Sequence, residues 1–183
     1  MSNVSAIPKA AQISLSDLVD NCIKIQPGQE VVIFAQVDGL YGGVNMVDTE
    51  AISWIQTFVQ SRGANASVLW IDEPAKPHAW RVPPIVKGAI SKCDVFINNS
   101  FDMEWEDIPE LKDAIKTRGA ALVRNFATTA PLLCSDWAQT PYELVTEIRT
   151  QTSLNFRNGL DWQLTDPNGT HLEGKIVAEE DPK

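Results

Sequence analysis

Apolar residues are arranged along this chain in two alternating patterns, short continuous runs and segments of helical period. Residues 31–35 read Val-Val-Ile-Phe-Ala, an uninterrupted run whose length and β-branched content are typical of a strand buried on both faces. Similar short apolar runs occur at residues 67–71, 94–98 and 120–124. The pattern therefore predicts four short strands in a sheet that is covered on both sides.

Segments with helical spacing of apolar residues lie before and between these runs. The predicted helices cover residues 12–25, 49–62, 84–92 and 109–117. Ser14 or Ser16 can cap the first, the Pro-Gly pair at 27–28 can end it, and Asp48 or Thr49 can cap the second. Regular alternation of strand and helix implies right-handed crossovers. We therefore expect an α/β fold with an open, mainly parallel, doubly wound sheet of about four strands and flanking helices.

The last part of the chain follows a different pattern. The sequence Thr-Pro-Tyr-Glu at 140–143 is a capping box with proline at the first helical position, which predicts a further helix. Residues 160–165 and 171–177 flank the turn sequence Asp-Pro-Asn-Gly, which predicts a β-hairpin. The expected organisation is a disordered or extended N-terminus at 1–11, an α/β domain at 12–157, and a hairpin segment at 158–183.

Composition and charge exclude several classes of function. The chain has 183 residues, 44% of them hydrophobic, which is ordinary for a globular protein. Its formal net charge of -9 repels phosphate backbones, so no nucleic-acid partner is expected. The N-terminus lacks the pattern of a secretory signal, and no apolar run approaches the roughly 18 residues of a membrane span. We expect a cytoplasmic protein without a membrane partner.

Chemistry in an open α/β sheet is expected beyond the carboxyl ends of the strands. The polar residues near these ends that we take as candidates for substrate binding are His78, Asn98, Asn99, Ser100 and Arg124. The amides can hold a small polar ligand or cap the following turn. Arg124 can reach a carboxylate or form a plain surface ion pair, and His78 can serve as a base or as an ordinary loop histidine.

A self-contained metal or triad site is hard to build from this sequence. The chain has two histidines, His78 and His171. It has no His-Glu-x-x-His helix, no Gly-x-Ser-x-Gly elbow and no cluster of histidine and carboxylate at ligand spacing. We therefore expect no metal site within this chain and leave the catalytic residues unassigned.

Five stretches, taken in order, carry a resemblance to a known family. They read Cys-Ile-Lys-Ile-Gln-Pro-Gly-Gln-Glu-Val-Val-Ile at 22–33, Asp-Thr-Glu-Ala-Ile at 48–52, Arg-Gly-Ala at 62–64, a Pro-Pro pair at 83–84 before the helix-to-strand passage at 89–97, and Leu-Thr-Asp-Pro-Asn-Gly-Thr-His-Leu at 164–172. From about residue 12 to 177 the chain resembles the N-terminal domain of the M29 (aminopeptidase T-like) metallopeptidase family. That superfamily also includes 2,5-dihydroxypyridine 5,6-dioxygenases.

The resemblance implies that this chain is the N-terminal domain of a two-domain metalloenzyme. The divalent metal (Zn, Co, Mn or Fe) would be bound by histidine and acidic side chains of a C-terminal domain that follows the hairpin and is missing here. This chain would wall the active-site cleft, would be inactive alone, and would belong to a homo-oligomer. Its partner would be its own C-terminal domain or a separate metal-binding subunit.

The family has a hydrolytic branch and a ring-cleaving branch. In the dioxygenase branch a histidine from the loop after the third strand approaches the substrate, whereas residues 98–109 of this chain contain no histidine. The resemblance therefore leans towards an aminopeptidase-like hydrolase. Two alternatives stay open, a stand-alone α/β module that binds a small polar ligand and a non-catalytic subunit that completes another chain's site.

Overall fold

The chain folds into two compact units. The computed structural model describes residues 4–36, 47–71, 83–99, 108–125, 128–156 and 159–177. Unit 1 comprises Met1–Pro141 and contains the parallel sheet, whereas unit 2 comprises Tyr142–Lys183 and contains a helix and a hairpin. The helix that opens at Tyr142 thus belongs with the hairpin.

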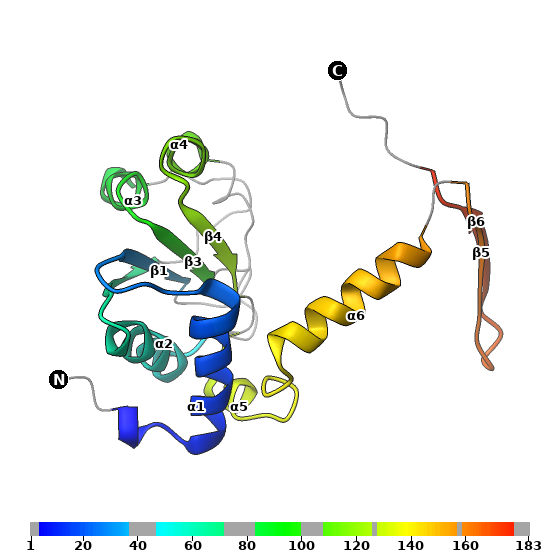
Figure 1. The fold of residues 1–183 in the computed structure, drawn as a ribbon, viewed down its shortest axis with the longest axis horizontal. Helices are drawn as coiled ribbons and strands as arrows, with labels where there is room; N and C mark the ends of the chain where they lie inside the picture. Colours follow the sequence, from blue (N-terminus) through cyan, green and yellow to red (C-terminus); the bar gives the residue numbers. More distant parts are fainter. Residues whose placement is uncertain are drawn as a thin grey trace. The chain divides into compact units, whose positions relative to one another are not determined.

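Unit 1 is a four-stranded, all-parallel sheet with helices on both faces (Figure 1). The strand order is β2-β1-β3-β4. The strands are β1 (Glu30–Gln36), β2 (Asn65–Ile71), β3 (Val95–Asn99) and β4 (Ala121–Arg124). The helices are α1 (Lys9–Ser16), α2 (Thr49–Ser61), α3 (Pro84–Ile90), α4 (Pro109–Arg118) and α5 (Ala130–Leu133). The predicted open α/β fold with a parallel sheet of four strands and a terminal hairpin is confirmed.

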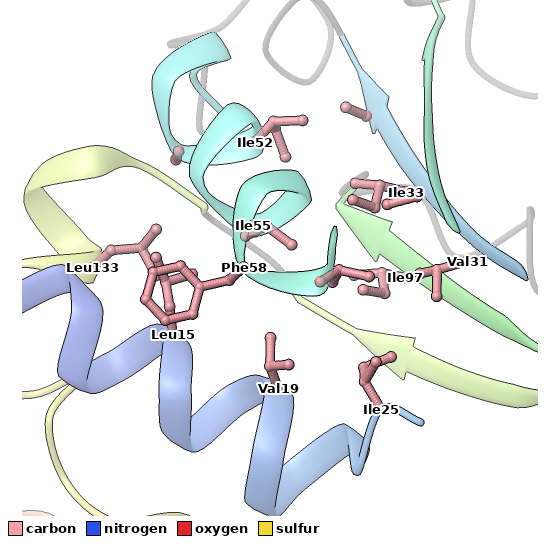
Figure 2. Close-up of a cluster of buried hydrophobic side chains, with 14 of the residues drawn as sticks. Leu15, Val19, Ile25, Val31, Ile33, Ile52, Ile55, Phe58, Ile97 and Leu133 are labelled. Atoms are coloured by element: carbon pink, nitrogen blue, oxygen red, sulfur yellow. The ribbon is translucent and has the colours of Figure 1, made fainter. Parts of the chain in front are cut away.

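Alternate residues of the central strand enter two different cores, because successive side chains of a strand point to opposite faces. Val31, Ile33 and Ala35 of β1 pack in one cluster with side chains of α1, α2 and α5. Figure 2 shows this cluster, in which Leu15, Ile52, Ile55, Phe58 and Leu133 are labelled on the helices that cover β1 and β3. The continuous apolar run in β1 is therefore the signature of a strand covered on both sides.

The second core lies between the sheet and helices α3 and α4. Phe34 of β1 and Phe96 of β3 are both fully buried there, and their ring centroids lie 5.8 Å apart. Val86 and Ile90 of α3 and Leu111 of α4 complete the cluster. Burial of a phenylalanine side chain stabilises a fold by about 2–3 kcal/mol, so these two rings anchor the layer.

The first helix differs from its prediction in where it starts. Within the N-terminal segment 1–11, which was expected to be disordered or extended, Val4–Ala6 form a 3-10 turn and α1 begins at Lys9. Pro8 stands at the helix entry with φ -54°, a value that proline holds without cost. The alanines at 10 and 11 are strong helix formers and extend the helix towards the N-terminus.

The same helix also differs in its geometry and its end. From Asp17 to Ile23 it continues as a π-helix, and Lys24 then adopts the left-handed conformation with φ 61°. The helix therefore ends before the Pro-Gly pair at 27–28 that was expected to stop it. The expected caps Ser14 and Ser16 lie inside the helix, where Ser14 donates to the carbonyl of Ala10.

The direction of chain winding reverses between β1 and β3. The chain leaves β1 through α2 to β2 on one side, and it returns through α3 to β3 on the other side of β1. Helix α2 contributes to one core, and α3 contributes to the opposite one. In doubly wound sheets such a reversal leaves a crevice at the carboxyl ends of the two strands, which is where ligands bind.

Unit 2 consists of α6 (Tyr142–Asn155) and an antiparallel hairpin of β5 (Asp161–Thr165) and β6 (His171–Lys175). The predicted turn between the strands forms as expected, with Gly169 at φ 96° and Asp166 accepting hydrogen bonds at the turn. The hydroxyl of Thr170 and the backbone N–H of Asn168 hold the pKa of Asp166 below its ordinary value. No described residue of this unit is buried.

Candidate functional site at the carboxyl ends of the strands

The two inner strands, β1 and β3, and the edge strand β4 each change from apolar to polar residues at their carboxyl ends. β1 ends on Gln36, β3 ends on Asn98 and Asn99, and β4 ends on Arg124, followed by Asn125. Because the strands are parallel, these residues lie along one edge of the sheet. The edge includes the winding reversal between β1 and β3, so it is the candidate site.

Asn99 is a structural crosslink at this edge. Its side chain has no exposed surface, and its Nδ2 donates to the carbonyl oxygens of Phe34 (3.1 Å) and Ile97 (3.4 Å). Its Oδ1 accepts from Asn125 Nδ2 (3.0 Å) and from Thr128 Oγ1 (2.9 Å). The amide therefore joins β1, β3 and the segment after β4, and we assign it the positioning of that segment.

Asp48 fixes the same segment from the other side. Its Oδ1 accepts from the backbone N–H of Ala51 (2.6 Å), which confirms Asp48 as the cap of α2. Its Oδ2 accepts from the backbone N–H of Ala130 (2.7 Å), the first residue of α5. Its own N–H donates to the carbonyl of Thr128 (3.0 Å). One carboxylate thus caps two helices and holds Thr128 beside Asn99.

A row of three polar residues points to the opposite face, towards α3 and α4. Phe34 lies in the core on that face, and Gln36 follows it by two positions in the same strand. Asn98 is the register partner of Phe34, and Arg124 is the register partner of Asn98, so all share the face. We call Gln36, Asn98 and Arg124 the polar row.

Gln36 differs from the other buried amides. Its side chain is 3% exposed, and its Nε2 has no hydrogen-bond partner among the residues that the structure describes. Asn98 is fully buried, and Arg124 is exposed at the strand end. Gln36 begins the first strand-end segment but was not among the residues expected to bind substrate. The sequence signal that could have identified it is its position two residues after Phe34, which places both side chains on the same face of the strand.

The other sequence candidates are separated from this group. His78 and Ser100 lie outside the described residues. Of the two asparagines, Asn98 belongs to the polar row, whereas Asn99 faces the other core and its amide is occupied by internal hydrogen bonds. The structure therefore brings Asn98 and Arg124 together and assigns Asn99 to the support of the site.

The described residues do not fit a metal centre. Within the described ranges, no three His, Cys, Asp or Glu side chains are grouped so that they could hold a metal ion. His171 lies on the exposed hairpin, where its Nε2 is 3.7 Å from Glu173 Oε2.

Cys22 and Cys93 are poor nucleophiles in the folded chain. All three are free, and Cys93 is buried beneath α3. Burial raises the pKa of the Cys93 thiol to about 11, so it is protonated at neutral pH. Burial and the nearby carboxylate of Asp17 also raise the pKa of Cys22.

Two open hollows lie away from the strand ends. One, of about 630 Å³, is lined by hairpin residues on both sides of Trp162 and Gly174. The other, of about 570 Å³, lies against the outer face of α1 near Lys9, Asp20 and Pro141. Both are wide open to solvent, and neither touches the polar row. Among the described helices, none combines the length and the apolar character that crossing a membrane requires.

Comparison with solved structures finds related folds, one of which is described here. The chain is similar to 2,5-dihydroxypyridine dioxygenase from Pseudomonas putida KT2440, with a TM-score of 0.61 and 11% sequence identity. The likeness covers 92% of this chain and 48% of that protein, so this chain spans about half the length of its neighbour. No protein-family model and no curated protein matches the sequence. The comparison therefore establishes a shared fold.

Proposed function

We propose that this chain is the N-terminal domain of a two-domain, metal-dependent enzyme, in which it walls the active-site cleft. The observation that carries the proposal is the fold likeness to a dioxygenase. It covers 92% of this chain but only 48% of the dioxygenase. The ordered sequence resemblance to the M29-like superfamily points to the same architecture. In this proposal the metal ligands come from the second domain.

The hairpin supports the need for a second domain. Trp162, Leu164 and Leu172 share one face of the two strands, because Leu164 pairs with Leu172 and Trp162 lies two positions away. All three are at least 40% exposed. Asp161 and Gln163 belong to the opposite, polar face. A lone two-stranded hairpin is marginally stable in water, so this apolar face requires a covering surface.

Helix α6 supports the same conclusion. Leu144, Val145 and Ile148 share one side of the helix at helical spacing, and each is about half exposed or more. A helix with an exposed apolar stripe gains most of its stability from packing against a partner. In the proposal, the second domain covers these side chains as well as the hairpin. A separate metal-binding subunit would supply the same cover.

Two observations bear on the branch of the superfamily, and they favour different branches. The similar solved structure is a dioxygenase, which favours ring cleavage with iron as the metal. The stretch 98–109 contains no histidine, which favours an aminopeptidase-like hydrolase with Zn, Co or Mn. The proposal therefore rests on the shared architecture, with a divalent metal supplied from outside this chain.

Hydrogen exchange of the hairpin tests this proposal. The backbone amides of β5 and β6 would be compared between the 183-residue chain and the protein made from its native reading frame. We expect exchange at least tenfold slower in the latter, because an apolar partner surface then covers the hairpin. Leu164→Asp should abolish this protection, and the matched change Gln163→Asp on the polar face should leave it intact. Equal exchange rates in the two proteins would contradict the proposal.

A further inference from the structure

We propose that the polar row binds the carboxylate of a small ligand that has an apolar body. The inference rests on the proposed function in one respect, because it identifies that ligand as the substrate of the enzyme. The binding itself needs only Gln36, Asn98 and Arg124, which belong to unit 1. It therefore does not depend on a metal or on a second domain.

The first observation is the buried donor of Gln36. Its side chain is 97% buried, yet its Nε2 meets no acceptor among the described residues. Native proteins pair most buried polar atoms, because an unpaired one loses its hydration without compensation. An unpaired donor at the reversal between β1 and β3 is therefore explained most simply by an acceptor that arrives with a ligand.

Comparable amides in the same unit are satisfied internally. Asn99 makes four hydrogen bonds with its amide, and Gln56 of α2 donates from Nε2 to the carbonyl of Ala66 (3.0 Å). The fold thus satisfies the buried amide of Asn99 at the strand ends and the partly buried amide of Gln56 on α2. Among the buried side-chain amides of the described ranges, Gln36 is the one with an unpaired donor, and it stands where this fold class binds ligands.

The second observation is the charge at the other end of the row. Arg124 lies on the same face as Gln36 and is separated from β1 by one strand. Neighbouring strands lie about 4.8 Å apart, so the row crosses roughly 10 Å of the sheet, within reach of an arginine side chain. A carboxylate matches a guanidinium and an amide donor together, and a charge-assisted hydrogen bond is stronger than a neutral one.

The third observation is the apolar surface beside Gln36. Ile71 is its register partner on β2 and shares its face, and Leu69 lies two positions earlier on the same strand. Both are partly buried against the α3–α4 core. A ligand that places its carboxylate on the polar row therefore has an aliphatic or aromatic body that can lie against Ile71.

The test uses the 183-residue chain, labelled with nitrogen-15, and two probes of one shape, benzoate and benzamide. The side-chain NH₂ signals of Gln36, assigned from their loss in Gln36→Met, report directly on the donor. We expect benzoate to shift these signals in a saturable manner, because the carboxylate accepts from Nε2. We expect benzamide to bind about tenfold more weakly, because it lacks the charge that Arg124 recognises. Arg124→Met should lower the affinity for benzoate to that of benzamide.

Gln36→Met removes the donor and keeps the volume, and Gln56→Met is the matched control at a satisfied amide. Gln36→Met should weaken benzoate binding about tenfold or more and should leave the urea midpoint of unfolding unchanged or higher. Gln56→Met should lower the midpoint and leave benzoate binding unchanged. A lowered midpoint for Gln36→Met would show that its amide is satisfied, and would overturn the inference.

The inference also fails if benzoate at millimolar concentration leaves the Gln36 signals in place, or if benzamide binds as tightly as benzoate. These outcomes are independent of the proposed function, which is tested by protection of the hairpin. If the hairpin is protected but benzoate does not bind, the ligand inference is wrong and the two-domain proposal stands. If benzoate binds but the hairpin is not protected, the ligand inference stands and a stand-alone binding module is favoured over the two-domain enzyme.

Discussion

Removal of the Asp48 carboxylate should destabilise unit 1 more than the loss of an ordinary helix cap. Asp48 accepts from Ala51 N–H at 2.6 Å and from Ala130 N–H at 2.7 Å, so one side chain caps both α2 and α5. Asp48→Ala leaves both N–H groups without these acceptors. The backbone hydrogen bond from residue 48 to the Thr128 carbonyl does not involve the side chain and should persist.

The magnitude follows from the number of hydrogen bonds lost. A helix cap contributes about 1 kcal/mol, and a hydrogen bond to a charged group about 1.5–3 kcal/mol, so the two together should contribute about 2.5–4 kcal/mol. Asp48→Asn keeps one carbonyl oxygen for one N–H but turns an NH₂ group towards the other. We expect it to cost about half as much as Asp48→Ala by the same reasoning.

The assay is equilibrium unfolding in urea, followed by far-ultraviolet circular dichroism, with amide exchange at Ala51 and Ala130 as a local readout. The control is Thr129→Ala, which removes a single longer hydrogen bond to Leu132 N–H at 3.3 Å and should cost less than about 1 kcal/mol. If Asp48→Ala unfolds at the wild-type urea concentration, or if only the Ala51 amide becomes faster to exchange, the double cap is refuted.

Three further predictions concern local features. Cys93, whose pKa is about 11 through burial, should resist iodoacetamide at pH 8 in the native chain and react once urea unfolds it; rapid native labelling would contradict this. Gly174→Ala should distort the hairpin, because a Cβ there would lie 2.8 Å from the Trp162 ring, and unchanged Trp162 proton shifts would argue against this contact. The hydrogen bond from Lys87 holds the pKa of Glu110 below its ordinary value, so the stabilisation that it contributes is present above the ordinary pKa of a glutamate and is lost as the pH falls through the lowered value. Lys87→Met should therefore reduce unfolding stability at pH 7 but not near pH 3, and an equal loss at both would contradict the ion pair.

The strands and helices could be predicted because burial imposes a local pattern. A strand covered on both faces must be apolar throughout, which is why residues 31–35 predicted β1 and why the bounds of β3 and β4 differ from prediction by one residue at most at each end. The cap at Asp48 and the turn at 166–169 were predictable for the same reason, since each acts on residues a few positions away. The π-helix at Asp17–Ile23 has no comparable local signal.

The site could be predicted only in outline. Parallel strands bring their carboxyl ends to one edge, so the positions of Asn98 and Arg124 followed from the fold class. The two roles that distinguish the edge depend on contacts across the chain. Asn99 is crosslinked to Thr128, 29 residues away, and Asp48 caps a helix 82 residues away. The unpaired donor of Gln36 is likewise a property of packing, which no spacing in the sequence reveals.

The most direct test of the central claim is the intact mass and the divalent metal content of the protein purified from its native reading frame. The account predicts a mass well above 20.2 kDa, since the similar dioxygenase is about twice as long as this chain, and about one divalent metal ion per chain. It also predicts that the 183-residue chain alone retains no stoichiometric metal. A native product of 20.2 kDa that purifies without a metal-binding partner would contradict the account.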